Sequence, residues 1–84
     1  MFEIWRDLGS GERYLVAVRA GLPTVAAGPL PPGSDPRVVL ESRGNKQHNA
    51  WALLSMRRAP AEYAREYTTD KHGRAVAVAD GTPS

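Results

Sequence analysis

The chain has 84 residues, of which 42% are hydrophobic and 24% charged, and it contains no cysteine. This length suits one hydrophobic core, and the composition is that of a folded globular domain rather than a disordered chain. The absence of cysteine excludes disulfides, thiol nucleophiles and cysteine-ligated zinc. The formal net charge of +2 is too small to predict a nucleic-acid partner by itself.

Residues 1–80 are predicted to form a single α+β domain, with residues 81–84 as a disordered tail. The first seven residues include two acids and lack a basic start followed by an apolar segment, so no signal peptide is expected. The apolar runs are much shorter than the roughly 20 residues that a membrane-spanning helix requires. We therefore expect a cytoplasmic protein with no membrane partner, small enough for a second copy to add stability.

The first third of the chain predicts a three-stranded antiparallel meander. Apolar and polar residues alternate over Phe2–Arg6, and Tyr14–Val18 is apolar on both faces, as in a well-covered strand. The segment Asp7–Gly11 between them is rich in residues that tolerate positive φ, which indicates a hairpin loop longer than two residues. A second turn over Ala20–Pro23 would return Thr24–Ala27 alongside the second strand.

A short helix is predicted after the proline-rich segment Pro29–Ser34, which can be neither helix interior nor central strand. Asp35 is placed to cap its N-terminus, Pro36 to occupy its first position and Gly44 to follow its end. The adjacent residues Val38–Val39 leave a strand as the alternative, because β-branched residues favour strands.

The clearest helical pattern begins near Lys46 or Asn49 and ends at Arg58. Trp51 and Leu54 fall on its apolar face and are expected to point into the core. This main helix is expected to end there because the proline at position 60 steers the preceding residue away from helical angles.

The segment from residue 60 to residue 67 leaves two interpretations. It could begin a new helix at Pro60, or Tyr63–Thr69 could already be a strand, and in both cases the two tyrosines would share one face. The turn Asp70–Gly73 and the alternating run Arg74–Ala79 predict a second hairpin. The predicted fold class is therefore α+β: an antiparallel sheet of four to five strands, with one main and one short helix on one face.

No catalytic or metal-binding motif stands out in the sequence. His48, His72 and Asp70 are the plausible metal ligands, but they lack the spacing of a known motif, and exposed histidines fit the pattern better. The serines lack a nucleophile elbow, and the carboxylates lack apolar flanks that would raise a pKa for acid–base chemistry. The glycines of Gly9–Gly11 lead into a strand, unlike those of a phosphate loop. We expect a protein that is not an enzyme and holds no metal or cofactor.

Binding is the class of function that remains. If Phe2 and Ile4 face a single layer of helices, Trp5 lies on the opposite, uncovered face of the sheet, where Leu15 and Ala17 would join it in a partner surface. The first hypothesis is therefore a non-enzymatic protein-interaction module, with homodimerisation through this face as one form of it.

The alternative hypothesis is a nucleic-acid-binding accessory protein. Basic residues gather on the rim of the predicted main helix, where they could contact phosphates: Arg43, Lys46, Arg57 and Arg58. A solvated helix face with cations near its C-terminus explains the same residues without any ligand.

Overall fold

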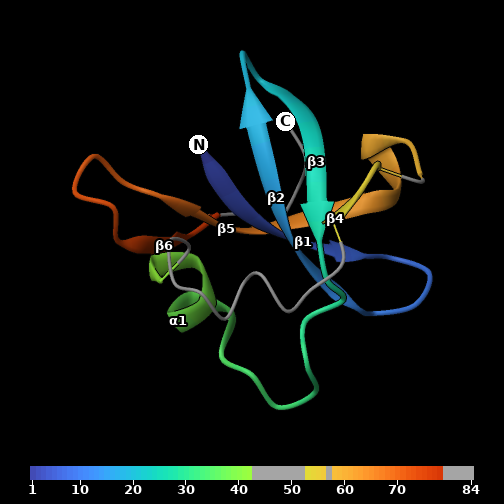
Figure 1. Cartoon of the computed structure of the whole chain (residues 1–84), viewed down its shortest axis with the longest axis horizontal. Helices are drawn as coiled ribbons and strands as arrows, with labels where there is room; N and C mark the ends of the chain where they lie inside the picture. Colours follow the sequence, from blue (N-terminus) through green and yellow to red (C-terminus); the bar gives the residue numbers. More distant parts are fainter. Residues whose placement is uncertain (43–52, 57, 79–84) are drawn as a thin grey trace.

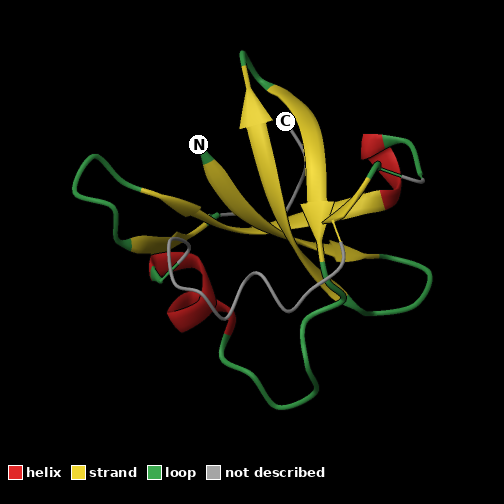
Figure 2. Ribbon diagram, in the orientation of Figure 1, coloured by secondary structure: helices red, strands yellow, loops and turns green. Residues whose placement is uncertain are grey.

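The computed structural model describes residues 1–42, 53–56 and 58–78 of the chain. They form a six-stranded antiparallel sheet with strand order β4-β3-β2-β1-β5-β6, one α-helix and a 3-10 turn (Figures 1 and 2). The elements are β1 (Phe2–Asp7), β2 (Arg13–Arg19), β3 (Leu22–Ala27), α1 (Pro36–Glu41), β4 (Leu53–Leu54), the 3-10 turn (Pro60–Glu62), β5 (Tyr63–Thr69) and β6 (Ala75–Ala77). The predicted α+β class and antiparallel sheet are confirmed. Within the described ranges, no helix has the length and apolarity to cross a membrane.

Both faces of the sheet carry a buried apolar cluster. Opposed residues of an antiparallel pair share a face, and the β1–β2 register places Ile4 opposite Leu15 and Trp5 opposite Tyr14. The first cluster, on what we call the Ile4 face, contains Ile4, Leu15, Ala27, Val39 and Leu40. The second cluster, on the Trp5 face, contains Trp5, Val16, Val18, Ala26 and Tyr63. The prediction placed helices on one face of the sheet, and it does not account for the buried cluster on the other face.

Two connections join the three strands of the meander: a longer loop between β1 and β2 and a tighter turn between β2 and β3. In the loop after β1, Oδ1 of Asp7 accepts hydrogen bonds from the backbone N–H groups of Gly9 at 2.7 Å and Ser10 at 3.3 Å. Between β2 and β3, Ala20 and Gly21 both have positive φ, of 50° and 76°. Two central residues of this kind form a two-residue hairpin turn that matches the twist of the strands. The predicted second turn is thus shorter than expected, and β3 begins directly after it.

The short helix begins where it was predicted and covers the Ile4 face. It ends at Glu41 with Ser42 as its C-cap, and Gly44, which was predicted to follow its end, lies outside the described residues. Asp35 caps α1, because its Oδ1 accepts a hydrogen bond from the backbone N–H of Arg37 at 2.9 Å. Leu40 is fully buried against the sheet, and Figure 1 shows α1 beside β6. Val38–Val39 therefore belong to a helix, and the strand alternative is excluded.

The predicted main helix is wrong over the part of its span that the structure describes. Leu53–Leu54 form β4, which pairs antiparallel with Ala26–Ala27 of β3, and the described residues from there to Arg58 are not helical. Two adjacent leucines carry no periodicity that separates a helix from an edge strand, so pairing with β3 decides their conformation. The rest of the predicted helix, with Trp51, lies outside the described residues.

The two tyrosines of β5 lie on opposite faces of the sheet. The strand interpretation of this segment is confirmed, but Ile4 is opposite Tyr67 while Trp5 is opposite Arg65, which leaves Glu66 as an extra residue. Such a bulge interrupts the alternation of side chains. Tyr63 therefore packs in the Trp5 cluster and Tyr67 against the Ile4 cluster, and the prediction that they share a face is wrong.

The predicted second hairpin is confirmed between β5 and β6. Its turn is built on Asp70, whose Oδ1 accepts hydrogen bonds from the backbone N–H groups of His72 at 2.8 Å and Arg74 at 2.9 Å. The predicted tail, residues 81–84, lies outside the described residues.

Asp35→Ala should lower the free energy of unfolding by about 1 kcal/mol, because the N–H of Arg37 then loses its side-chain acceptor. Asp35→Ser keeps an oxygen at the cap and should cost much less. Urea denaturation followed by circular dichroism measures both values. Equal losses in the two variants would contradict the capping role.

Candidate functional site

The structure separates Trp5 from the two residues that were expected to join it. Trp5 is opposite Tyr14 on one face, whereas Leu15 is opposite Ile4 on the other face, and Ala17 follows Leu15 by two positions. Trp5 and Leu15 are each only 5% exposed. The prediction that Trp5, Leu15 and Ala17 form one surface is wrong, because the cross-strand register decides which residues of β2 share a face with Trp5.

Of the basic residues that were expected to contact nucleic acid, the structure describes Arg58. Its Nε lies 3.0 Å from Oδ2 of Asp7, and its Nη1 lies 3.6 Å from Oε1 of Glu62. The other three lie outside the described residues: Arg43, Lys46 and Arg57. Arg58 is therefore engaged with two carboxylates of its own chain, and the nucleic-acid hypothesis stays a prediction.

The residues considered as metal ligands are not brought together in the described part of the chain. The carboxylate of Asp70 is used by the backbone of its own turn, and His48 lies outside the described residues. Within the ranges described, no three side chains of histidine, aspartate or glutamate gather as a metal site would require.

A hollow of about 430 Å³ opens on the Trp5 face. The start of β1, the β2–β3 hairpin, the 3-10 turn and β5 surround it. Its walls and rim are largely apolar, and the residues that supply them are Met1, Trp5, Val18, Leu22, Pro23 and Pro60. Trp5 and Val18 are buried, whereas Met1 and Leu22 are each 67% exposed. We call this feature the Trp5 hollow.

A buried ion pair forms the polar part of the Trp5 hollow. The side chain of Glu3 is 3% exposed and that of Arg65 is 24% exposed. Arg65 binds Glu3 through two hydrogen bonds, from Nε to Oε1 at 3.0 Å and from Nη2 to Oε2 at 2.7 Å. Trp5 Nε1 donates to Oε1 at 2.8 Å, and Thr68 Oγ1 donates to Oε2 at 2.8 Å. Each carboxylate oxygen of Glu3 therefore accepts two hydrogen bonds.

The bulge in β5 makes this arrangement possible. Arg65 and Thr68 are three residues apart, and three residues of a regular strand would point to opposite faces. Because Glu66 is an extra residue between them, Arg65 and Thr68 both point to the face that carries Glu3. The position of Arg65 opposite Trp5 then brings the guanidinium group to the carboxylate.

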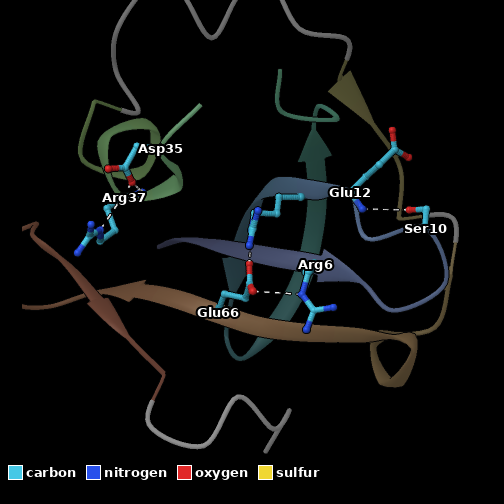
Figure 3. Close-up of polar contacts among 7 residues, drawn as sticks. Arg6, Ser10, Glu12, Asp35, Arg37 and Glu66 are labelled. Carbon is cyan, nitrogen blue, oxygen red and sulfur yellow. Dashed lines mark hydrogen bonds and ion pairs between the residues drawn. The ribbon is translucent and has the colours of Figure 1, made fainter. Parts of the chain in front are cut away.

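Glu66 is used on the other side of the sheet, where it bridges two arginines (Figure 3). Its Oε2 lies 3.1 Å from Nε of Arg6, and its Oε1 lies 2.5 Å from Nε of Arg13. Arg6 and Arg13 are directly opposite each other in β1 and β2, where two like charges are destabilising without a counterion. The group of three retains one net positive charge.

In their effect on the pKa of Glu3, the hydrogen bonds to its carboxylate outweigh its burial. Burial alone would raise the pKa of the Glu3 carboxyl, but the hydrogen bonds from Arg65, Trp5 and Thr68, together with the charge of Arg65, hold the pKa below its usual value. The carboxylate is therefore ionised and neutralised by Arg65 at neutral pH. An acid that donates a proton near neutral pH needs a raised pKa, so Glu3 is suited to a structural role.

Asp7 is the second buried acid, at 6% exposure. The backbone N–H of Gly9 is the main cause that holds the pKa of the Asp7 carboxyl below its usual value; burial opposes it, and Ser10 and Arg58 add to it. Like Glu3, Asp7 is paired with an arginine.

The chain matches no protein-family model, and comparison with curated proteins and with solved structures yields no match either. The geometry of the site is therefore the basis for inferring a function.

The sequence pointed to Trp5 but missed the ion pair beside it. Glu3 is an acid next to Trp5 in an otherwise apolar strand, which is a weak signal for a buried charge. Its partner Arg65 lies 62 residues further along the chain, so no local pattern connects them. The sequence gives no signal for Leu22 and Pro60 either, because its pattern places Leu22 in a turn and Pro60 at a helix boundary.

At acidic pH the protein should lose the contribution that the ionised Glu3 carboxylate makes to the free energy of unfolding. Because its pKa is lower in the folded than in the unfolded state, this stability is complete above about pH 4.3 and is lost as the pH falls through the folded-state pKa. The free energy of unfolding, measured by urea denaturation across a pH series, should therefore fall less steeply in Glu3→Gln than in the original protein.

Glu12→Gln, the same substitution at an exposed acid, provides the matched control for this series. A Glu3→Gln variant with the same slope as the original protein would show that Glu3 carries no acid-sensitive stability.

Arg65→Met should destabilise the protein by roughly 3 kcal/mol, because it leaves the Glu3 carboxylate buried without its cation. Adding Glu3→Gln should recover part of this loss, since the unpaired charge is then gone. Arg6→Met, which removes a partner of the more exposed Glu66 pair, should cost no more than about 1 kcal/mol. Urea denaturation of these three variants and of Glu3→Gln alone measures the coupling between Glu3 and Arg65, and equal losses for Arg65→Met and Arg6→Met would contradict the stronger role of the buried pair.

Proposed function

We propose that this chain is a non-enzymatic protein-interaction module that binds an apolar side chain of a partner protein in the Trp5 hollow. The observation that carries the proposal is the combination of apolar walls with a strongly exposed apolar rim. Met1 and Leu22 at the rim are each 67% exposed. Exposed apolar groups gathered around a hollow are typical of a surface that is covered in a complex.

The size of the hollow supports this kind of ligand. A volume of about 430 Å³ falls in the range of roughly 300 to 1,000 Å³ typical of ligand pockets, and it accommodates one large aliphatic or aromatic side chain. Full burial of such a side chain contributes about 1.5 to 3 kcal/mol. Binding through one anchor of this kind would be weak, and a stable complex would need further contacts around the rim.

The wall of the hollow is held in place before any partner arrives. The indole N–H of Trp5 is bound to Glu3, and its ring packs against Tyr63 with a centroid distance of 5.9 Å. A side chain fixed in this way loses little freedom on binding, which lowers the entropic cost of forming a complex.

The charge of the hollow favours a neutral ligand. Its charged side chains among the described residues, Glu3 and Arg65, neutralise each other, and the N-terminal ammonium of Met1 donates a hydrogen bond to the carbonyl of Val18 at 3.2 Å. A charged group that entered would lose its hydration, and the carboxylate and guanidinium that line the hollow already bind each other, whereas an apolar group has no such cost. The proposed ligand is therefore a leucine, methionine or aromatic side chain rather than an acidic or basic one.

An NMR titration with short capped peptides tests the proposal. Acetyl-Gly-Leu-Gly-amide and acetyl-Gly-Phe-Gly-amide, added up to about 10 mM, should shift the signals of Trp5 Nε1–H, Val18 and Arg65, whereas acetyl-Gly-Asp-Gly-amide should not. The exposed Val76 on β6, which is no part of the hollow, provides the reference signal. The absence of shifts at the hollow with both apolar peptides would rule out the proposed function.

A further inference from the structure

We infer that a second pocket on the Trp5 face, beside the loop between β1 and β2, binds the ammonium group of a lysine side chain. The inference takes from the proposed function only that the partner is a protein. The pocket has a volume of about 190 Å³ and shares no lining residue with the Trp5 hollow. We call it the Glu12 pocket. Its lining includes Asp7, Glu12, Tyr14, Leu54, Met56 and Arg58.

The charges of the Glu12 pocket favour a cation. Nε of Arg58 lies 3.0 Å from Oδ2 of Asp7, so this guanidinium group neutralises the buried acid. Glu12 is exposed, and within the described ranges no cationic side chain forms an ion pair with it. The described lining therefore holds two carboxylates and one guanidinium group, and the unbalanced charge is that of Glu12. A positively charged ligand complements such a pocket.

A tyrosine in the lining is affected by the same negative charge. Burial is the main cause that raises the pKa of the Tyr14 phenol, and the charge of Glu12 raises this pKa further. The backbone N–H of Glu12 donates to Oγ of Ser10 at 3.2 Å, and Figure 3 shows the Glu12 side chain extending away from the loop. The negative potential that opposes ionisation of the phenol favours an ammonium group at the same place.

The rest of the lining suits the stem of a lysine side chain. Ala26, Leu54 and Met56 supply apolar groups, and lysine carries a compact charge on a four-carbon apolar stem. The volume of the pocket is less than half that of the Trp5 hollow, which favours this slender side chain over the planar guanidinium group of arginine. The ammonium group would therefore bind Glu12 while the stem contacts the apolar residues.

A titration with capped peptides, followed by NMR, tests the inference. Acetyl-Gly-Lys-Gly-amide, added up to about 10 mM, should shift the backbone signals of Tyr14 and Ser55, which both line the Glu12 pocket. Acetyl-Gly-norleucine-Gly-amide carries the same stem without the charge and should shift them much less. Glu12→Gln should weaken binding of the lysine peptide about threefold, as expected for the loss of an exposed ion pair. Glu41→Gln, the same substitution at an exposed acid of α1 outside the pocket, is the matched control and should leave binding unchanged.

The outcomes separate this inference from the proposed function. A lysine peptide that leaves both signals unchanged, or that binds Glu12→Gln as well as the original protein, overturns the lysine site. An equal effect of the norleucine peptide, or a larger effect of acetyl-Gly-Arg-Gly-amide, overturns it too. In each of these cases, a leucine peptide that still shifts the signal of Trp5 Nε1–H leaves the proposed function standing. A response of the Glu12 pocket to lysine, without any response of the Trp5 hollow to apolar peptides, would remove the proposed function and support the lysine site.

Discussion

The hydrogen-bonded Glu3–Arg65 pair holds the two ends of the chain in one sheet. Glu3 belongs to the N-terminal meander, while Arg65 and Thr68 belong to the C-terminal hairpin, and β1 and β5 meet where these side chains bind. A buried carboxylate without such donors costs several kcal/mol. A different register between β1 and β5 would separate Arg65 and Thr68 from the carboxylate and remove its cation, so the pair favours the observed register as well as stabilising it. It also fixes Trp5, which donates to the same carboxylate.

The single extra residue in β5 serves both faces of the sheet. On the Trp5 face it brings Arg65 and Thr68 to the same carboxylate. On the Ile4 face it directs Tyr67 toward the buried cluster and places Glu66 between two arginines that would otherwise repel each other. The bulge is therefore a requirement of the electrostatics of this sheet, because a regular strand would satisfy only one of the two faces.

The two faces differ in how they are covered. The Ile4 face is packed by α1, which buries Leu40. On the Trp5 face the described residues contribute strands, loops and the 3-10 turn, and these leave a hollow with an exposed apolar rim. A chain of 84 residues has limited material to cover both faces of a sheet. The hollow that the described residues leave open is where a partner would stabilise the sheet most, and this links the fold to the proposed binding function.

The sequence alone determined the features that depend on contacts within a few residues. The strands of the meander, the Asp35 cap and the Asp70 turn follow from hydrogen bonds and backbone preferences of adjacent residues. Tertiary structure decided the rest: which face Trp5 shares, the bulge at Glu66, the strand β4 and the pairing of Glu3 with a residue 62 positions away. These depend on register between distant strands, and a shift of one residue reverses every face. The sequence could therefore single out Trp5, but only the folded sheet could show what surrounds it.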